Sequence, residues 1–312
     1  MVLFHQNKPE VAGVAPRRHS DARLAFFRAA ERLFVWAGGR RFYRHFFLRA
    51  GRFVVREERV YVPDLPPELD GFSIAQLSDF HAGPFLGAGD LDDVIAAVEA
   101  LDVDLVAMTG DFITHHSREV ECVLHDLGRF RSRLGSFAVL GNHDYHRRQE
   151  ARIVTGLAQQ GVRCLRNESV RLDVGTAQLY VVGLEDLEES RDVDPERARA
   201  DVPAGGLEIL LCHNPMGAPR LYREGCIAIL SGHTHGTQID LPVLRRMGPQ
   251  HPGLRVDFGP TTLLVSRGIG VVGAPLRFRA PAEIVCVRLV RGAAQEVVDG
   301  NSDVAVAPGL VD

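Results

Sequence analysis

Five short polar segments, each directly after an apolar run, constrain the fold of this chain more than any other feature. Apolar runs of this length are typical of strands, so the polar segments fall at strand ends. Because the carboxyl ends of strands in an α/β sheet meet along one edge, the sequence predicts that these side chains converge on one site. The segments are Ser-Asp-Phe-His at 78–81, Thr-Gly-Asp at 109–111, Gly-Asn-His-Asp at 141–144, Cys-His-Asn at 212–214 and Gly-His-Thr-His-Gly at 232–236.

The residue types in these segments indicate a metal centre. Aspartate, asparagine and histidine supply oxygen and imidazole ligands, and no thiolate is required, a combination that suits manganese, iron or zinc. A single Asp-x-His is usually a surface pair, and a single Asn-His-Asp is usually a turn. Five such segments in one chain are hard to explain by chance, so we expect a site for divalent metal ions.

The composition is that of an ordinary globular protein. Of the 312 residues, 46% are hydrophobic and 24% are charged, and the net charge of −4 provides no overall basic field for nucleic acid. The five cysteines form no Cys-x-x-Cys pair, which indicates reduced thiols in a cytoplasmic protein. No stretch approaches the roughly 20 apolar residues that span a bilayer. Residues 1–18 lack a continuous apolar segment, so no signal peptide is predicted.

The chain divides into three predicted parts: an N-terminal extension at 1–49, a main domain at 50–296 and a flexible tail at 297–312. In the main domain, strands and helices alternate from residue 72 and strands then dominate, which predicts a mixed β-sheet structure covered by helices. Strands are predicted at 52–64, 72–78, 103–109, 136–141, 178–184, 207–212, 226–232, 262–266 and 283–290, and helices at 21–37, 91–102, 120–130 and 147–160.

Taken together, the five segments resemble the calcineurin-like metallophosphoesterase superfamily, whose pattern is D-x-H, G-D, G-N-H-(D/E), H and G-H-x-H in this order. The resemblance covers residues 72–290. Within the superfamily the chain is most similar to the bacterial YkuE-like branch, through G-H-T-H-G-x-Q at 232–238 and SRGIGVVGAPLRFRAPAEI at 266–284. The resemblance implies an α/β fold, a sandwich of two mixed β-sheets flanked by helices, and makes residues 50–296 the catalytic domain.

The resemblance also implies two divalent metal ions, manganese first and iron or zinc as alternatives. Two cations about 3.5–4 Å apart would clamp a phosphoryl group, and a hydroxide bridging them would attack phosphorus. Asp79, His81 and His235 would hold one ion, Asn142, His213 and His233 would hold the other, and Asp111 would bridge both and count as catalytic.

His143 has a different implied role, because it would contact the phosphate and protonate the leaving oxygen as a general acid. Many relatives carry a second aspartate three residues after the bridging one, and it orients this histidine. Here that position is Thr114, which supplies no charge, so either His143 is less stabilised or Asp144 compensates. His115, His116 and His146 are interpreted as loop residues at the rim of the site.

Two further features leave alternatives open. Arg267 and Arg277 either bind substrate phosphate or are buried in salt bridges behind the site. The connection at 237–260 either caps the substrate or is an ordinary exposed loop.

Aromatic and arginine residues alternate through 21–56, and the predicted helix at 21–37 places Phe26, Phe27, Leu33 and Phe34 on one face. One interpretation is contact with an anionic membrane surface, which would make the protein peripheral on the inner face of the membrane. The other is a pair of helices packed on the catalytic domain with their arginines reaching water. Single-stranded nucleic acid is a third, less favoured partner.

The implied function is metal-dependent hydrolysis of a phosphoester. A phosphodiester or pyrophosphate is favoured over a phosphomonoester, because the resembling branch leans that way. If the N-terminal part touches a membrane, a lipid-linked substrate becomes attractive, and UDP-2,3-diacylglucosamine of lipid A synthesis is the alternative. A non-catalytic metal-binding scaffold is the alternative of another class. Scaffolds with this fold tend to lose the catalytic histidine or a ligand, whereas this chain keeps His143 and all seven proposed ligands.

Overall fold

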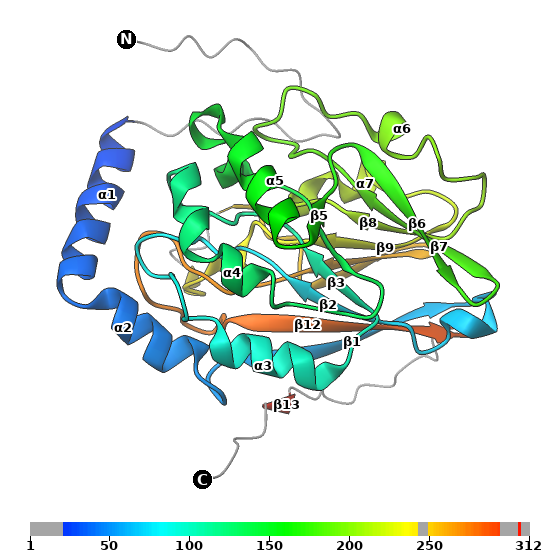
Figure 1. The fold of residues 1–312 in the computed structure, drawn as a ribbon, viewed down its shortest axis with the longest axis horizontal. Helices are drawn as coiled ribbons and strands as arrows, with labels where there is room; N and C mark the ends of the chain where they lie inside the picture. Colours follow the sequence, from blue (N-terminus) through cyan, green and yellow to red (C-terminus); the bar gives the residue numbers. More distant parts are fainter. Residues whose placement is uncertain (1–20, 243–248, 294–304, 307–312) are drawn as a thin grey trace.

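The computed structural model describes residues 21–242, 249–293 and 305–306, and it shows two β-sheets packed face to face with helices on the outside (Figure 1). In these residues the first sheet has seven strands in the order β13-β1-β12-β2-β3-β4-β5. It is mixed, because β12 pairs antiparallel with β2 while β2, β3, β4 and β5 run parallel. The strands are β1 Val54–Val62, β2 Ser73–Leu77, β3 Leu105–Met108, β4 Ser136–Ala138, β5 Val162–Cys164, β12 Glu283–Arg291 and β13 Ala305–Val306.

The second sheet has six strands among the described residues, in the order β10-β11-β9-β8-β7-β6. Its centre is parallel from β7 through β8 and β9 to β11, and both edge strands are antiparallel to their neighbours. The predicted sandwich of two mixed sheets is therefore confirmed. The strands are β6 Glu168–Val174, β7 Ala177–Gly183, β8 Glu208–Leu211, β9 Cys226–Ser231, β10 Arg255–Phe258 and β11 Thr261–Val265.

The described core has three layers, one between the two sheets and one over the outer face of each sheet, which explains why the central strands read as continuous apolar runs. Every residue of β2 is buried: Ile74 joins the cluster between the two sheets, whereas Ala75 and Leu77 join the cluster under the helices. A strand covered on both faces needs no polar side. The four strands that the sequence pattern missed are β5, β6, β10 and β13, and all four lie at sheet edges.

The helices predicted at 21–37 and 91–102 form within one residue of their expected bounds, the one at 147–160 begins three residues later, at Glu150, and the one at 120–130 is wrong. In this range the chain forms a 3₁₀ turn, η3, followed by a four-residue helix, α4. The Glu119 side chain folds back toward the preceding loop, where its carboxylate accepts the amide protons of residues 114–116, and this fixes the 3₁₀ turn. The helices are α1 Asp21–Trp36, α2 Gly39–Tyr43, α3 Asp92–Leu101, α4 Leu124–Leu127, α5 Glu150–Gln159, α6 Pro195–Ala198 and α7 Ala218–Leu221, with a π-helical turn η1 Arg44–Leu48 and 3₁₀ turns η2 Pro67–Leu69, η3 Ser117–Cys122, η4 Asn142–Arg148, η5 Pro215–Gly217 and η6 His235–Thr237.

The N-terminal helices lie against one side of the sandwich (Figure 1), and they are attached to it unevenly. Tyr43 and Leu48 are fully buried in the cluster under the helices, and the Tyr43 hydroxyl donates to the Ile269 carbonyl at 2.5 Å. Packing on the domain therefore describes α2 and η1. By contrast, Leu33 and Trp36 of α1 are 62% and 86% exposed.

Two predictions, the apolar face of the helix at 21–37 and the flexible tail at 297–312, fall partly outside the described residues. The side chains of Phe26 and Phe27 lie outside the described residues, as does the predicted flexible tail apart from Ala305–Val306, which forms β13. In the described part of the chain, no helix is both long enough and apolar enough to cross a membrane.

Candidate metal centre

The five polar segments do meet, at the place where the carboxyl ends of both sheets come together. Asp79 follows β2, Asp111 follows β3 and Asn142 follows β4, all in the first sheet, whereas His213 follows β8 and His233 follows β9 in the second. Two buried hydrogen bonds tie the sheets together here. The Gln76 amide donates to the Ser231 carbonyl at 2.8 Å, and the His213 Nδ1–H donates to the Thr109 carbonyl at 2.6 Å.

The backbone at this edge is held in an unusual conformation. Asp79, His81, Asp111, His233 and His235 all have positive φ angles, between 47° and 71°. A left-handed conformation costs a residue with a side chain about 1 kcal/mol or more, so the surrounding structure must impose it. Backbone hydrogen bonds do so, since the amide of Asp79 donates to the carbonyl of Gly110 and the amide of His81 to that of Asp111. Five strained residues at one edge are typical of a functional site.

One group of ligand atoms gathers around the end of β2. The Nε2 atoms of His81 and His235 lie 2.9 Å apart, and the same nitrogen of His235 is 3.4 Å from Asp79 Oδ1. Asp111 Oδ2 lies 3.5 Å from His81 Nε2. Burial lowers the pKa of both imidazoles well below its usual value, so they are neutral and present lone pairs. Such a donor set fits a divalent cation.

A second group lies on the other side of Asp111. Asn142 Oδ1 is 2.9 Å from His233 Nδ1 and 3.2 Å from His213 Nε2, and Asp111 Oδ2 is 3.3 Å from the same His213 nitrogen. Because His213 Nδ1 must carry a proton to donate to the Thr109 carbonyl, its Nε2 is left as the ligand atom. All seven predicted ligands are thus brought together, with Asp111 common to both groups.

Asp111 is the charged centre of the site. Burial by itself would raise the pKa of this carboxyl, but His213 and His143 hold the pKa well below its usual value. Its other oxygen, Oδ1, accepts the backbone amide proton of His143 at 2.9 Å. One carboxylate therefore faces both groups of imidazoles while it also anchors the segment that carries His143.

His143 stands at the edge of the ligand groups, oriented by a backbone atom. Its Nδ1 lies 2.8 Å from the Thr114 carbonyl oxygen, which can only accept a hydrogen bond, so the proton is on Nδ1 and Nε2 is the outward nitrogen. The Thr114 hydroxyl points elsewhere and donates to the carbonyls of His81 and Ala82. His143 also lies close enough to His81 and Asp111 to form a third combination of ligand atoms.

Asp144 does not replace the missing aspartate beside His143. Its carboxylate is fully buried and accepts backbone amide protons from Asp111, Phe112 and Gly141 at 2.8–2.9 Å. It thereby joins the loops after β3 and β4, so its role in the structure is to hold the ligand segments in register.

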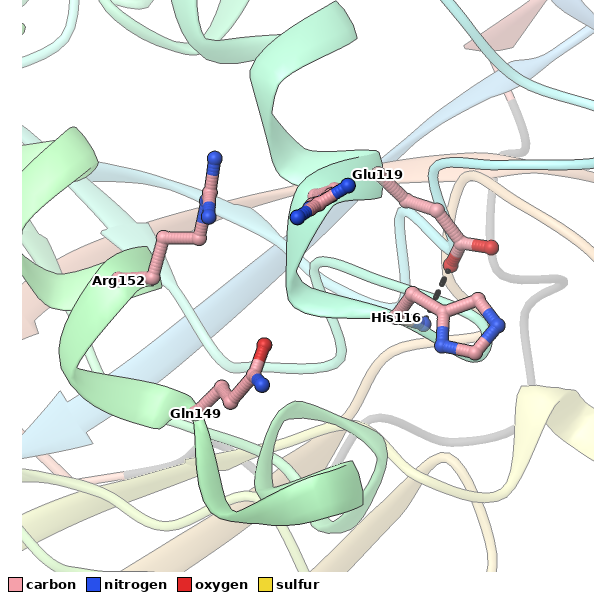
Figure 2. A pocket seen from close by; sticks show the side chains of 5 residues that line it. His116, Glu119, Gln149 and Arg152 are labelled. Carbon is pink, nitrogen blue, oxygen red and sulfur yellow. Dashed lines mark hydrogen bonds between the residues drawn. The ribbon is translucent and has the colours of Figure 1, made fainter.

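The three rim histidines have separate surroundings. His146 also approaches the Thr114 carbonyl, through Nδ1 at 3.2 Å, and burial lowers its pKa to about 3, so the ring is neutral at neutral pH. His115 Nε2 lies 2.6 Å from the Glu31 carboxylate of α1. His116 lines a cavity of about 720 Å³ between η3 and the start of α5, which Figure 2 shows with Glu119, Gln149 and Arg152 around it.

The two arginines of the late motif are engaged within the protein. Arg267 forms a salt bridge with the fully buried Glu283 at 2.6 Å. Arg277 is buried and donates to the carbonyls of Gly268, Gly270 and Ala280 and to the Tyr43 hydroxyl. Both arginines thus support the loop behind the site. Whether the connection 237–260 caps the substrate or is an ordinary exposed loop stays a prediction, because its residues 243–248 lie outside the described residues.

Sequence reasoning missed one carboxylate behind the second group. Glu188 Oε1 lies 3.5 Å from His233 Nε2 and accepts the Asn214 amide proton at 3.2 Å. A carboxylate on the far nitrogen of a ligating imidazole fixes its orientation and raises its basicity. The acidic run at 185–189 follows β7, which runs parallel to β8 in the same sheet. A search for polar residues directly after each predicted strand could therefore have found Glu188.

Replacing Thr114 with aspartate tests how His143 is oriented. The new carboxylate would face the two carbonyls that now accept from the hydroxyl, so we expect a loss of about 1–3 kcal/mol of folding stability and no gain in turnover. The expected fall of several degrees in Tm is measurable by thermal unfolding. Thr114→Ser, which keeps the hydroxyl, should match the wild type. A more active Thr114→Asp would mean that a side chain, and not the carbonyl, limits His143.

Comparison with known proteins gives a consistent picture. The family model for calcineurin-like phosphoesterase matches residues 72–237, just over half of the 312-residue chain. A Bos taurus relative named "Transmembrane protein with metallophosphoesterase domain" is 32% identical over 72% of this chain and 54% of its own length. The Bacillus subtilis metallophosphoesterase YkuE, named as uncharacterized, is 30% identical over 72% of this chain and 81% of its own.

Among solved structures, the NAD nucleotidase of Haemophilus influenzae shares 16% identity with a TM-score of 0.45, over 63% of this chain and 45% of that one. The chain spans about half the length of the first curated relatives that it matches, at 54% and 57%.

Proposed function

Because the chain belongs to the calcineurin-like phosphoesterase family, we propose that it hydrolyses a phosphoester at the site formed by the two ligand groups. The predicted resemblance to this family and to YkuE is confirmed. The observation that carries the proposal is the position of Asp111, whose Oδ2 lies 3.3–3.5 Å from an imidazole of each group. This arrangement suits two divalent cations, for which we propose manganese, with iron or zinc as alternatives.

Each part of the site would have a separate task. Asp79, His81 and His235 would hold one cation, and Asn142, His213 and His233 the other. The bound cations would withdraw charge from the phosphoryl oxygens and lower the pKa of a water molecule. His143, with its Nδ1–H held by the Thr114 carbonyl, would present Nε2 to the leaving oxygen and deliver a proton when the ring is protonated.

We propose a phosphodiester or pyrophosphate as the substrate class rather than a phosphomonoester. Two cavities of about 720 and 600 Å³ flank the loop after Thr114 and share His116. We infer that a second group on phosphorus, which a monoester lacks, would extend toward this loop. The test is a comparison of bis(p-nitrophenyl) phosphate with p-nitrophenyl phosphate after manganese loading. We expect a kcat/KM at least about tenfold higher for the diester, a difference of roughly 1.4 kcal/mol.

A non-catalytic scaffold is the competing class of function. The retention of His143 and of all seven ligand side chains argues against it, since a scaffold needs only the shape of the site. A protein that binds the metals but cleaves neither diesters, pyrophosphates nor monoesters would favour the scaffold.

The exposed face of the N-terminal helices supports a further proposal, attachment to an anionic membrane. Leu33 is 62% exposed, Phe42 42% and Phe46 45%, and Arg41 is exposed as well. Apolar burial at a lipid surface stabilises by roughly 25 cal/mol per Å², and each arginine adds about 1 kcal/mol near anionic headgroups. A lipid-linked substrate such as UDP-2,3-diacylglucosamine would then meet the site at that surface.

The membrane proposal predicts a sharp dependence on this face. The double variant Leu33→Ser/Phe46→Ser should sediment at least about tenfold less with phosphatidylserine vesicles, because apolar area is lost while the fold is kept. Tyr222→Ser, which removes a 48% exposed aromatic residue elsewhere, is the matched control and should bind like the wild type. Equal sedimentation of the wild type with neutral and anionic vesicles, or unchanged binding of the double variant, would refute membrane attachment through this face.

A further inference from the structure

The Glu119 carboxylate binds the loop that holds His143. Its Oε2 atom accepts the amide protons of three consecutive residues, Thr114 at 3.0 Å, His115 at 2.7 Å and His116 at 3.0 Å. Figure 2 shows the Glu119 side chain folded back over His116, with a dashed line at the third of these bonds. The shortest bond, from the His115 amide, has the length of a charge-assisted hydrogen bond.

One peptide group connects this carboxylate to His143. The His115 amide and the Thr114 carbonyl belong to the same peptide bond, which is trans, so its N–H and C=O point in opposite directions. On one side the N–H donates to Glu119 Oε2 at 2.7 Å, and on the other side the C=O accepts the Nδ1 proton of His143 at 2.8 Å. A negative charge at the N–H polarises the peptide, which makes its carbonyl oxygen a stronger acceptor for the imidazole.

The carboxylate is fixed in place by close packing. A Cβ at Gly83 would lie 2.8 Å from the Glu119 Cδ atom, so the backbone of that loop lies directly against the carboxylate. Arg152 lines the polar cavity of Figure 2 together with Glu119, but its guanidinium donates to Glu121 at 2.8 Å. In the described part of the chain Glu119 forms no salt bridge, so its hydrogen-bond partners are the three backbone amides.

We propose that Glu119 positions His143 through the Thr114–His115 peptide, in place of the aspartate that many relatives carry at residue 114. The inference rests on the proposed function, in which His143 protonates the leaving oxygen, but the chain of hydrogen bonds can be measured without any turnover. The competing explanation is that Glu119 only stabilises the turn η3, in which case its loss would affect stability and have no specific effect on His143.

The kinetic test combines substitutions at both ends of this chain of hydrogen bonds. Glu119→Gln keeps an oxygen that can accept the amide protons but removes the charge, so we expect the fold to be retained. For phosphodiesters with poor leaving groups, kcat should fall about tenfold, and the dependence of log kcat on leaving-group pKa should become steeper. In a His143→Ala background the same substitution should change kcat by less than about twofold, because the group that Glu119 positions is gone.

A neighbouring carboxylate supplies the matched control. Glu121 lies two residues further along η3, pairs with Arg152 and is 52% exposed. Glu121→Gln should leave both kcat and the leaving-group dependence unchanged. Elemental analysis of the manganese-loaded proteins should show the wild-type metal content in Glu119→Gln and Glu121→Gln alike, which excludes damage to the ligand groups as the cause of the lower kcat.

A second measurement needs no turnover. The Nδ1 proton of His143 should give a downfield resonance in the proton NMR spectrum, which is assigned through its loss in His143→Ala. Glu119→Gln should move this resonance upfield or lose it to exchange with water, because the Thr114 carbonyl becomes a weaker acceptor. Glu121→Gln should leave the resonance in place.

The outcomes separate this proposal from the proposed function. A loss of kcat that is equally large with and without the His143 side chain, together with an unmoved Nδ1 resonance, would overturn the positioning role and leave the hydrolase intact. A shifted resonance in a protein that hydrolyses no ester would support the positioning role and count against the hydrolase. A Glu119→Gln variant with the kcat and the resonance of the wild type would also overturn the positioning role.

Discussion

Replacing Asp111 with alanine is expected to remove both metal ions and nearly all hydrolysis. Asp111 Oδ2 faces an imidazole of each ligand group at 3.3–3.5 Å, so its loss deprives both proposed cations of a charged ligand. Elemental analysis of dialysed, manganese-loaded protein should show the metal content falling from about two ions per chain to well below one, and kcat/KM should fall by about 10³-fold or more.

Two companion variants make this experiment specific. Asp111→Asn keeps an oxygen for the His143 amide proton, so it preserves the loop while it removes the charge. It should lose metal almost as severely as alanine. Asp126→Ala removes a buried carboxylate that accepts the Gly89 amide proton, and it should keep its metals. Retention of both ions by Asp111→Asn would contradict a bridging role.

Replacing His143 with alanine should separate binding from chemistry. The expected result is full metal content with turnover reduced by about 10²–10⁴-fold for esters with poor leaving groups, because a general acid matters most where the leaving oxygen is basic. Good leaving groups such as p-nitrophenol should suffer much less. The measurement is the dependence of log kcat on leaving-group pKa, which should become steeper in the variant.

The neighbouring histidine supplies the control for this prediction. His146 shares the Thr114 carbonyl and its ring lies 4.7 Å from that of His143, but it is neutral and outside the ligand groups. His146→Ala should therefore leave the leaving-group dependence unchanged. A loss of metal in His143→Ala would place His143 among the ligands, as the third combination with His81 and Asp111 allows.

The pattern of strands and helices predicted a mixed β-sheet structure covered by helices and the convergence of the five segments, because both depend on strongly local signals, whereas the sandwich of two sheets was implied by the family resemblance. A central strand such as β2 is covered on both faces and must be apolar throughout, and the polar residues directly after it must lie at its carboxyl end. Edge strands lack this signal. In β6 most residues are partly or fully exposed, so its sequence alternates with charged residues and resembles a loop.

The tertiary structure decided which atom orients His143, because a backbone carbonyl leaves no trace in the residue types. The sequence shows only that residue 114 is a threonine and not an aspartate. In the structure the backbone carbonyl of Thr114, 2.8 Å from His143 Nδ1, makes the hydrogen bond that orients His143. Likewise, Glu188 reaches His233 only because β7 and β9 lie on either side of β8 in one sheet.

The N-terminal segment shows the same division. Its sequence predicted amphipathic aromatic helices, but it left open whether their apolar residues pack on the domain or face outward. In the structure Tyr43 and Leu48 are buried, while Leu33 and Trp36 are exposed. Burial depends on which surface lies opposite a helix, and that surface is built from residues far away in the chain. Sequence periodicity determined that α1 has an apolar face, and only the tertiary structure, in which Glu31 packs between two loops of the domain, decided where α1 lies.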